Sequence, residues 1–359
     1  MTFNFSEKIL NWSSQNPRPM PWKGIQNPYF IWLSEIILQQ TRVAQGLPYY
    51  LKFTAAYPTV ADLANAPLDD VFNLWQGLGY YSRARNLHAA ANYIANDLNG
   101  SFPTTYEGLL KIKGVGEYTA AAIASFAYNS DNAVIDGNVY RVLARVFGIN
   151  TAIDSTEGKK EFATLAQTLL PQGSAALYNQ AIMDFGATVC TPKQPKCDTC
   201  IFNENCVAFA EKTVATLPYK AKKMTKKNRF FHFFVFGNNN KVWLQKRTER
   251  DVWQDLHQFP MIETDGDAVL SDIIGSENFE NLFGESLNEK NIRIKTTTNL
   301  QQTLTHQSIL AKFYTVEQEI FVNFQNKSDF FLVFPKDIPT FALPKIMVDY
   351  LENHQTALF

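Results

Sequence analysis

The sequence predicts a multidomain protein in which an all-α domain is joined by a short linker to a smaller α+β domain. Three observations lead to this prediction. Apolar residues recur at helical spacing through residues 1–217, runs of aromatic and β-branched residues begin at residue 230, and a basic, proline-led run separates the two parts. A chain of 359 residues, 46% of them hydrophobic, has the length and the apolar content for about two cores.

The first part contains segments with helical periodicity and no segment that alternates as a strand. Proline and glycine separate these segments, whose lengths suit helices of three to four turns. The clearest are FIWLSEIILQQTRVAQ (30–45), SRARNLHAAANYIAND (82–97) and EYTAAAIASFAY (117–128). We therefore expect an all-helical domain over residues 1–217.

The run PYKAKKMTKKNR (218–229) is the predicted linker, and it carries six basic and no acidic side chains. The flanks are acidic by comparison, with a net charge of −1 over residues 1–217 and −6 over residues 230–359. The total of −1 argues against a protein that coats polyanions along its whole surface. The linker itself is either a solvated tether or a tether that also contacts phosphates.

The second part begins with strand-like runs. FFHFFVF (230–236) and KVWLQ (241–245) are separated by GNNN, which is typical of a β-hairpin. Further strand-like runs are LAKFYTV (310–316) and EIFVNF (319–324). We expect a small α+β domain over residues 230–359.

The beginning of the chain lacks the basic, apolar and small-residue pattern of a signal peptide. No apolar run reaches the roughly 18 residues that span a bilayer. We therefore expect a cytoplasmic protein without a membrane segment.

Four cysteines lie within 17 residues with the spacing C-x6-C-x2-C-x5-C: Cys190, Cys197, Cys200 and Cys206. Because disulfides are rare in the cytosol, such a cluster indicates a metal site. Four thiolates suit a [4Fe–4S] cluster or Zn²⁺, but zinc sites usually show two closely spaced pairs, and this sequence has one. The pattern favours iron–sulfur, with zinc or four free thiols as alternatives.

The segment LLKIKGVGEYTA (109–120) predicts two helices joined by a tight turn at Gly114, Val115 and Gly116. Glycines permit positive φ and close backbone approach, and the helix that follows presents free N–H groups to an anion. The turn is either a phosphate cradle or an ordinary helix–helix connection.

Two carboxylates are candidates for chemistry. Glu35 is the only ionisable residue in IWLSEIIL, and burial should raise its pKa, which suits a general acid. Asp136 in VIDGNVYRV precedes a predicted helix and is either only its N-cap or an N-cap that also faces a cleft. Cleavage of an N-glycosidic bond needs such a pair, one to protonate the leaving base and one to balance the charge on the sugar.

Together these motifs resemble the adenine-DNA glycosylase (MutY) family of the helix-hairpin-helix base-excision superfamily. The resemblance rests on SEIILQQTRV (34–43), QGLGYYSRARNL (76–87), LLKIKGVGEYTA, VIDGNVYRV and the four cysteines, which follow the order and spacing of that family. It covers essentially the whole helical part. It implies hydrolysis of the bond that joins adenine to deoxyribose opposite 8-oxoguanine or guanine.

By this resemblance, Glu35 protonates the adenine, at N7 in the usual proposal, and then helps to activate water. Asp136 stabilises the sugar cation or bonds to it transiently, and Asn138 and Tyr118 support the site. The related endonuclease III enzymes have a lysine where this chain has Tyr118. Because tyrosine cannot form a Schiff base, we expect a monofunctional glycosylase.

The resemblance also implies DNA contacts near the flipped adenine by Gln40, Thr41, Leu78 and Tyr80, with Tyr80 inserted beside the orphan base. It assigns the hairpin Gly114, Val115 and Gly116 to the phosphate backbone. The adenine pocket should include Trp22, Lys23 and Gln180, where the family usually has Arg instead of Lys23 and Glu instead of Gln180.

The second part resembles the MutT-like domain of that family, through KRTERDVWQDLHQFP (246–260). It lacks the R-E-x-x-E-E run that holds Mg²⁺ in Nudix hydrolases, so it should recognise rather than hydrolyse. In QTLTHQ (302–307), Thr305 and His306 stand where the family reads 8-oxoguanine.

The resemblance implies a [4Fe–4S] cofactor, double-stranded DNA with an adenine:8-oxoguanine or adenine:guanine mispair as the partner, and a monomer. The alternatives are another helix-hairpin-helix glycosylase or lyase, a Nudix-type nucleotide hydrolase, and a DNA-binding protein without activity. Tyr118 and the C-terminal domain argue against the first alternative, and the missing glutamates argue against the second.

Overall fold

The computed structural model describes residues 4–221, 225–238, 240–284, 287, 292–317 and 328–354. They form two compact units, residues 4–65 with 86–221 and residues 66–85 with the described residues from 225 onward. The first unit is helical, and the second combines several helices with two small β-sheets. The predicted combination of an all-α domain and an α+β domain is confirmed.

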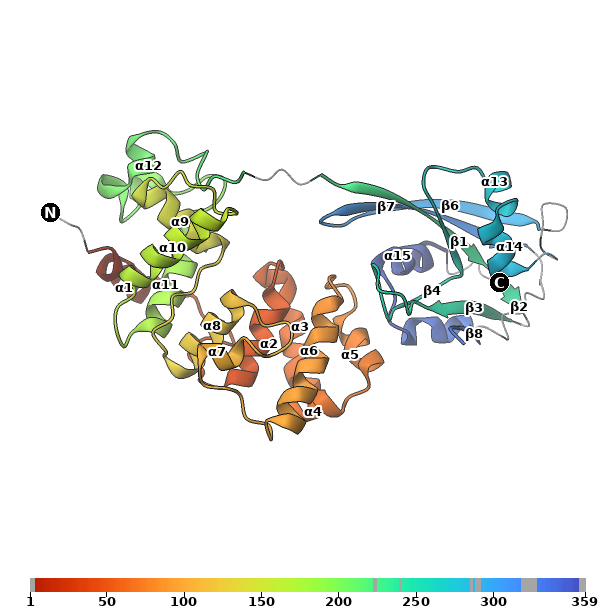
Figure 1. Ribbon diagram of the computed structural model, residues 1–359, viewed down its shortest axis with the longest axis horizontal. Helices are drawn as coiled ribbons and strands as arrows, with labels where there is room; N and C mark the ends of the chain where they lie inside the picture. The colour runs from red at the N-terminus through yellow and green to blue at the C-terminus, as the bar shows by residue number, and fades with distance from the viewer. Residues whose placement is uncertain are drawn as a thin grey trace. The chain divides into compact units, whose positions relative to one another are not determined.

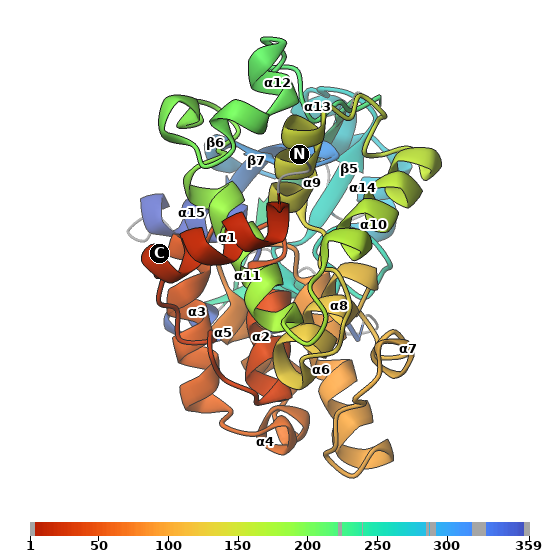
Figure 2. The same cartoon turned by 90° about the vertical axis from the view of Figure 1, so that its left-hand side faces the viewer.

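The helices of the first unit are α1 (Phe5–Gln15), α2 (Pro28–Leu38), α3 (Val43–Ala56), α4 (Val60–Asn65), α7 (Tyr106–Leu109), α8 (Glu117–Tyr128), α9 (Gly137–Phe147), α10 (Thr156–Leu169), α11 (Ala175–Thr188) and α12 (Val207–Ala210). Helix α6 (Ser82–Asn92) crosses from the second unit into the first and continues as a π-helical turn, Tyr93–Asp97. Helix α2 packs against α3 and α8 (Figure 1), and α1 lies against α11 (Figure 2).

Helix α2 lies in the centre of this unit because its sequence is apolar on every face. Asn27 caps its first turn and Pro28 occupies its first position, where the missing N–H costs nothing. Eight of its residues are buried, including Trp32 and Glu35. A helix that is apolar all round belongs in a core, and this one carries a single carboxyl group into it.

The predicted helix over residues 30–45 is wrong in one respect, since it breaks into α2 and α3. Gln40 adopts φ +54°, and no glycine or proline in the sequence marks this break. It allows α3 to turn back, and Gly46 then lies so close to α2 that an added Cβ would stand 2.7 Å from Leu38. The predicted helices over residues 82–97 and 117–128 are confirmed.

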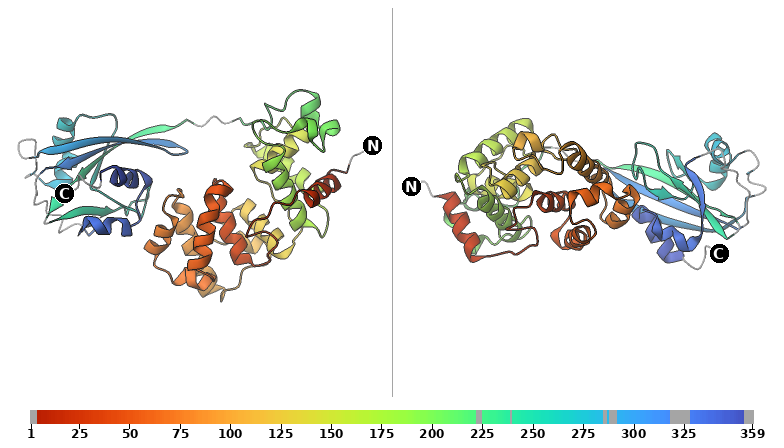
Figure 3. Two further views of the ribbon diagram at one scale, coloured as in Figure 1. Left: turned by 180° about the vertical axis from the view of Figure 1, so that it is seen from behind. Right: turned by 90° about the horizontal axis from the view of Figure 1, so that it is seen from below.

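The second unit contains α5 (Leu68–Trp75), β1 (Lys227–Val235), β2 (Gly237–Asn238), β3 (Lys241–Lys246), β4 (His257–Gln258), β5 (Met261–Thr264), α13 (Leu270–Ile274), α14 (Glu277–Phe283), β6 (Ile294–Thr303), β7 (Gln307–Val316), β8 (Phe330–Val333) and α15 (Lys345–His354). One sheet has the order β5-β1-β7-β6, and the other joins β2, β3, β4 and β8. The long strands β6 and β7 run side by side, as the blue ribbons of Figure 3 show.

Strand β1 is a central strand because its phenylalanines need cover on both faces. Phe233 stacks on Phe313, which also stacks on Tyr350 of α15, whereas Phe234 contacts Phe279 and Phe283 on the opposite face. The alternation of β1 side chains thus places helices on both sides of one sheet.

This arrangement corrects the predicted hairpin between residues 230–236 and 241–245. Strand β1 pairs with β5 and, in parallel, with β7, while the antiparallel hairpin partner of β3 is only the short β2, Gly237–Asn238. Strand β1 also begins at Lys227, inside the predicted linker. The predicted strand 319–324 and linker residues 222–224 lie outside the described residues.

Candidate active site

Glu35 lies inside the first unit with 7% of its surface exposed. Burial among apolar side chains of α2 disfavours the carboxylate and raises its pKa from 4.5 to about 7. The Tyr118 hydroxyl, from α8, donates a hydrogen bond of 2.7 Å to Glu35 Oε2 and opposes part of that rise. Glu35 is therefore a carboxyl group that can hold and release a proton near neutral pH.

Asp136 caps the N-terminus of α9. Its Oδ1 accepts hydrogen bonds of 2.8 Å from the backbone N–H groups of Asn138 and Val139, and its Oδ2 accepts one of 2.6 Å from Asn138 Nδ2. Burial raises the pKa of Asp136 above its ordinary value, and these hydrogen bonds offset part of that rise. The negative charge of Asp136 also raises the pKa of Glu35, so the two carboxyl groups belong to one site.

Asn138 is held in turn by Arg141, a buried residue one turn further along α9. The Arg141 Nη2 donates to Asn138 Oδ1 and to the Gly186 carbonyl, both at 2.7 Å, and its Nε donates to the Cys190 carbonyl at 2.6 Å. An added Cβ at Gly186 would stand 2.7 Å from Asn138 Cβ, so glycine is needed for α11 to approach α9 this closely. A continuous series of hydrogen bonds thus joins Asp136 to the backbone of the cysteine segment.

Glu35 lines a cavity of about 370 Å³. A cavity of this volume suits a small organic ligand. The three residues predicted for the adenine pocket, Trp22, Lys23 and Gln180, all line it. Lys23 Nζ forms an ion pair of 2.5 Å with the buried Asp184 of α11 and donates to the Arg18 carbonyl at 2.9 Å. Burial lowers the pKa of Lys23.

The predicted hairpin forms between α7 and α8. Gly114 has φ +81°, and a Cβ there would stand 2.8 Å from Asn86 Cβ, so both its conformation and its packing require glycine. Val115 is buried, whereas nothing lies within 4 Å of the Cβ position of Gly116. Gly116 is the N-cap of α8 without a side-chain capping bond, so the helix start presents its N–H groups outward.

The residues predicted to contact DNA beside the flipped base occupy two loops. Gln40 and Thr41 lie in the break between α2 and α3, and Gln40 has positive φ. Leu78 and Tyr80 lie between α5 and α6, where Leu78 is buried and Tyr80 is 43% exposed. Within the second compact unit, the hydroxyl groups of Tyr80 and Thr305 lie in contact.

Cys190, Cys197, Cys200 and Cys206 follow the end of α11 and line one small cavity. Burial is the main cause that raises the pKa of Cys197, and the neighbouring thiol groups add to it. Burial also raises the pKa of Cys200 to about 11. Uncompensated thiolates are thus unfavourable here, and a cationic metal group would stabilise them. Arg145 Nη1 and the Phe202 N–H point at the sulfurs of Cys190 and Cys200, at 3.5 and 3.4 Å.

Among the described residues, no three His, Cys, Asp or Glu side chains converge closely enough to hold a single metal ion. Four thiols that line one cavity are the donor set that an iron–sulfur cluster takes. The donor set therefore fits an iron–sulfur cluster.

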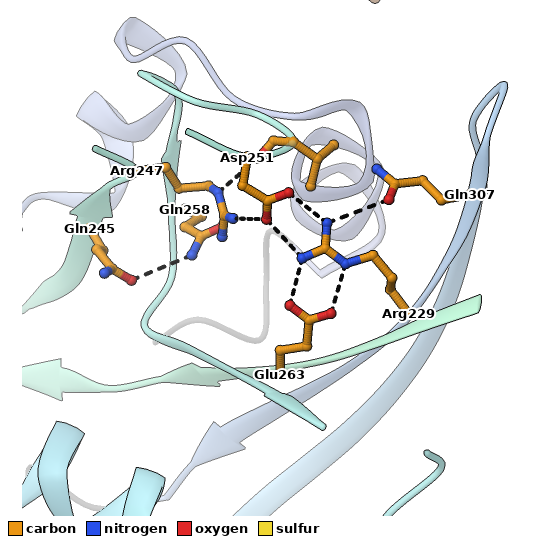
Figure 4. A network of polar contacts seen from close by, with 8 residues as sticks. Arg229, Gln245, Arg247, Asp251, Gln258, Glu263 and Gln307 are labelled. Carbon is orange, nitrogen blue, oxygen red and sulfur yellow. Dashed lines mark hydrogen bonds and ion pairs between the residues drawn. The ribbon is translucent and has the colours of Figure 1, made fainter. Parts of the chain in front are cut away.

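In the C-terminal part, a guanidinium occupies the centre of an acidic cluster (Figure 4). Arg229 forms two hydrogen bonds of 2.7 Å with Asp251 and bonds of 2.7 and 2.5 Å with Glu263, and Arg247 donates to Asp251 at 2.9 Å. Arg229 also reaches Gln307 at 3.4 Å, the first residue of β7. These carboxylates are neutralised by arginine and are poorly suited to hold Mg²⁺.

The Gln307 end of this network adjoins the turn between β6 and β7, which carries Thr305 and the exposed His306. The Leu304 N–H donates to the Gln307 carbonyl at 2.8 Å, and the Lys227 N–H donates to the His306 carbonyl at 3.1 Å. Two backbone hydrogen bonds thus fix the turn and leave the His306 side chain exposed.

Helix-hairpin-helix geometry, a buried acid beside a capping aspartate and an adjoining cavity define a base excision DNA repair enzyme of the glycosylase class. The model of the HhH-GPD superfamily base excision DNA repair proteins matches residues 33–171, and that of the NUDIX domain matches residues 232–353. The chain belongs to the adenine DNA glycosylase family. It is 34% identical over 297 residues to adenine DNA glycosylase of Buchnera aphidicola subsp. Acyrthosiphon pisum, which covers 82% of this chain and 81% of the relative.

Other relatives agree. Adenine DNA glycosylase of Homo sapiens is 42% identical over 213 residues, covering 57% of this chain and 39% of the relative. Among solved structures, a thermostable thymine-DNA glycosylase aligns with a TM-score of 0.54 and 31% identity over 58% of this chain and 95% of that one. An endonuclease III–DNA complex, 20% identical with a TM-score of 0.51, covers 59% and 99% and shares the fold.

Two buried groups near the site escaped the sequence analysis. Arg141 and Asp184 act through partners far along the chain, which local sequence patterns do not indicate. Among the described residues, no helix combines the length and the apolar character needed to cross a bilayer.

Proposed function

We propose that this DNA glycosylase hydrolyses the N-glycosidic bond of adenine mispaired with 8-oxoguanine or guanine. The observation that carries the proposal is that Glu35, protonated near neutral pH, lines a cavity that suits a flipped base and lies near enough to Asp136 for the charge of Asp136 to raise its pKa. A neutral acid and an ionised carboxylate are the two groups that departure of a base from deoxyribose requires.

In the proposed reaction, the bond between deoxyribose C1′ and adenine N9 breaks, and its electron pair leaves with the base. Glu35 donates its proton to the adenine, at N7, so that the base leaves neutral. Asp136 balances the positive charge on the sugar, held by the two backbone N–H groups and by Asn138. Water then attacks C1′, and the Glu35 carboxylate takes its proton.

In this proposal, Tyr118 is the reason why the enzyme hydrolyses the glycosidic bond without cleaving the DNA strand. Its hydroxyl is engaged with Glu35 and cannot form a Schiff base with the opened sugar. We therefore propose a monofunctional glycosylase, and efficient strand cleavage that borohydride traps would contradict it.

The DNA contacts are proposed on separate surfaces. The open N–H groups at Gly116 suit a phosphate, and Gln40, Thr41 and Tyr80 suit the neighbourhood of the flipped base. Leu78, being buried, contributes to the shape of its loop. Trp22, Lys23 and Gln180 would form the adenine pocket.

The [4Fe–4S] cluster is proposed to be held by Cys190, Cys197, Cys200 and Cys206. When bound, it would supply a rigid, redox-capable group that fixes the segment carrying the exposed Lys193 and Lys196. In the C-terminal part, Thr305 and His306 would read 8-oxoguanine. We further propose a cytoplasmic monomer.

The test is a base-release assay on duplexes with adenine opposite 8-oxoguanine, guanine or thymine, with thymine opposite guanine as a fourth substrate. We expect release of adenine from the first two duplexes and little from the others. Release of thymine, as the name of the solved relative suggests for that protein, would contradict the proposal.

A further inference from the structure

The loop between α5 and α6 holds an aromatic residue in an unusual conformation. Tyr80 has φ +49°, a region that side-chain-bearing residues seldom adopt, and it follows Gly77 and Gly79, which also have positive φ. Tyr80 as a whole is 43% exposed. A large exposed aromatic group on a backbone of this kind needs an external support to stay in place.

Two buried side chains supply that support through the backbone carbonyls of the loop. The Trp75 indole N–H donates to the Gly79 carbonyl at 2.9 Å. The Arg83 Nη2 donates to the same carbonyl at 3.2 Å and approaches that of Leu78 at 3.5 Å, while the Arg83 backbone N–H donates to the Tyr80 carbonyl at 2.9 Å. Three successive carbonyls of the loop thus face Arg83.

The Arg83 guanidinium also lies between two aromatic rings. Its central carbon is 5.0 Å from the ring centroid of Trp75 and 5.6 Å from that of Tyr80, within the range of cation–π interactions. Arg83 itself is 8% exposed. A single buried cation therefore contacts both the backbone and the ring of Tyr80, and it also contacts the ring of Trp75.

We propose that Arg83 is a positioning residue that holds Tyr80 ready for insertion into mispaired DNA. This inference rests on the proposed function, which places Tyr80 beside the orphan base. If the loop were free, Tyr80 would lose conformational entropy on each insertion, and a loop fixed beforehand avoids that loss. Arginine suits the task because its planar fork can donate to carbonyls while its face stacks on a ring, which the compact ammonium of lysine cannot do equally well.

The experiment is a double-mutant cycle on the full-length protein with Tyr80→Ala, Arg83→Met and the combined variant. The readouts are dissociation constants for duplexes with an adenine:8-oxoguanine mispair and with an adenine:thymine pair, and the single-turnover rate of adenine release at saturating DNA. Arg293→Met, which removes an exposed cation, is the matched control for lost charge.

We expect Arg83→Met to weaken mispair binding about tenfold, as loss of one base–aromatic stack would. Binding to the matched duplex should change little, and Arg293→Met should have no effect. The combined variant should bind like Tyr80→Ala alone, because Arg83 acts through that ring. Arg83→Lys, which retains the charge, should restore part of the lost affinity.

Equal weakening on both duplexes, or effects that add fully in the combined variant, would overturn the inference and leave Arg83 a structural residue. Circular dichroism shows whether Arg83→Met folds. If it does not, the double-mutant cycle is repeated with Arg83→Lys in its place, and weakening confined to the mispaired duplex and absent from the Tyr80→Ala background again supports the inference. Wild-type affinity of Tyr80→Ala would overturn the inference together with the proposed insertion. Absence of adenine release by the unaltered protein would instead refute the proposed function.

Discussion

At the scale of single residues, the site depends on one carboxyl group placed where its charged form is unfavourable. The sequence alone indicated this for Glu35, since it is the only ionisable group in an apolar helix. It could not indicate the Tyr118 hydrogen bond or the Arg141 contacts, because those partners lie on other helices. The burial of a side chain can be predicted from the local composition of its helix, whereas its hydrogen-bond partners depend on how the helices pack in three dimensions.

Tyr118→Phe should shift the pH dependence of adenine release. The Tyr118 hydroxyl donates to the Glu35 carboxylate, stabilises its ionised form and so lowers its pKa. The wild-type single-turnover rate should fall as pH rises through about 7, where Glu35 loses its proton. In Tyr118→Phe this decline should occur at higher pH, and a decline at lower pH would contradict the assigned hydrogen bond.

Glu35→Gln should stabilise the protein at alkaline pH. The pKa of Glu35 is higher in the folded than in the unfolded state, so its stabilising effect is present below pH 4.5 and is lost as pH rises through about 7. A rise from 4.5 to about 7 corresponds to a penalty on the order of 3 kcal/mol above pH 7.

Urea unfolding at pH 8 and at pH 4 measures this effect. The free energy of unfolding of Glu35→Gln should exceed that of the wild type at pH 8 and should approach it at pH 4. A variant less stable than the wild type at pH 8 would argue against a carboxyl group destabilised by burial.

At the scale of secondary structure elements, local chain signals predicted the starts of helices well and the breaks between elements poorly. Helices α8 and α9 begin where Gly116 and Asp136 indicated. The break between α2 and α3 carries Gln40 at positive φ, which no sequence rule marks. The predicted hairpin forms only between the short β2 and β3, because β1 pairs instead with β5 and with the parallel β7, which lies far along the chain.

The hairpin offers a matched pair of variants. Gly114→Ala should destabilise the protein by roughly 1–2 kcal/mol, because Gly114 has positive φ and its Cβ would crowd Asn86. Gly116→Ala should leave the melting temperature nearly unchanged, since no atom lies within 4 Å of its Cβ position.

Both variants should weaken DNA binding, Gly116→Ala because its methyl group would stand where a phosphate approaches the backbone. Thermal unfolding and duplex affinity together check the pair. Unchanged DNA affinity of Gly116→Ala would exclude the hairpin as a close phosphate contact.

At the scale of the whole molecule, composition and charge patterning predicted two kinds of architecture in the correct order along the chain. They could not show that residues 66–85, helical in sequence, form one compact unit with residues from the C-terminal part. That grouping depends on side chains such as Arg85, which pairs with Asp255 at 2.5 Å. Such a contact leaves no trace in local periodicity.

The near-neutral total charge makes a prediction about DNA binding. If phosphates are held by the hairpin, the cysteine segment and the basic run, few counterions are released. The slope of log affinity against log salt should then be far shallower than the value of about −10 seen for extensive phosphate contact. Fluorescence anisotropy between 50 and 300 mM salt measures it, and a slope near −10 would contradict this view of local contacts.

The central claim is that Glu35 is the general acid, and Glu35→Gln tests it most directly. The measurement is single-turnover adenine release from an adenine:8-oxoguanine duplex, together with the dissociation constant of the same duplex. Glutamine retains the size and the hydrogen bonding of the protonated acid but cannot transfer its proton. We predict nearly unchanged binding with release slowed by a factor on the order of 10²–10⁴. Release at the wild-type rate by a variant that binds normally would contradict the assignment.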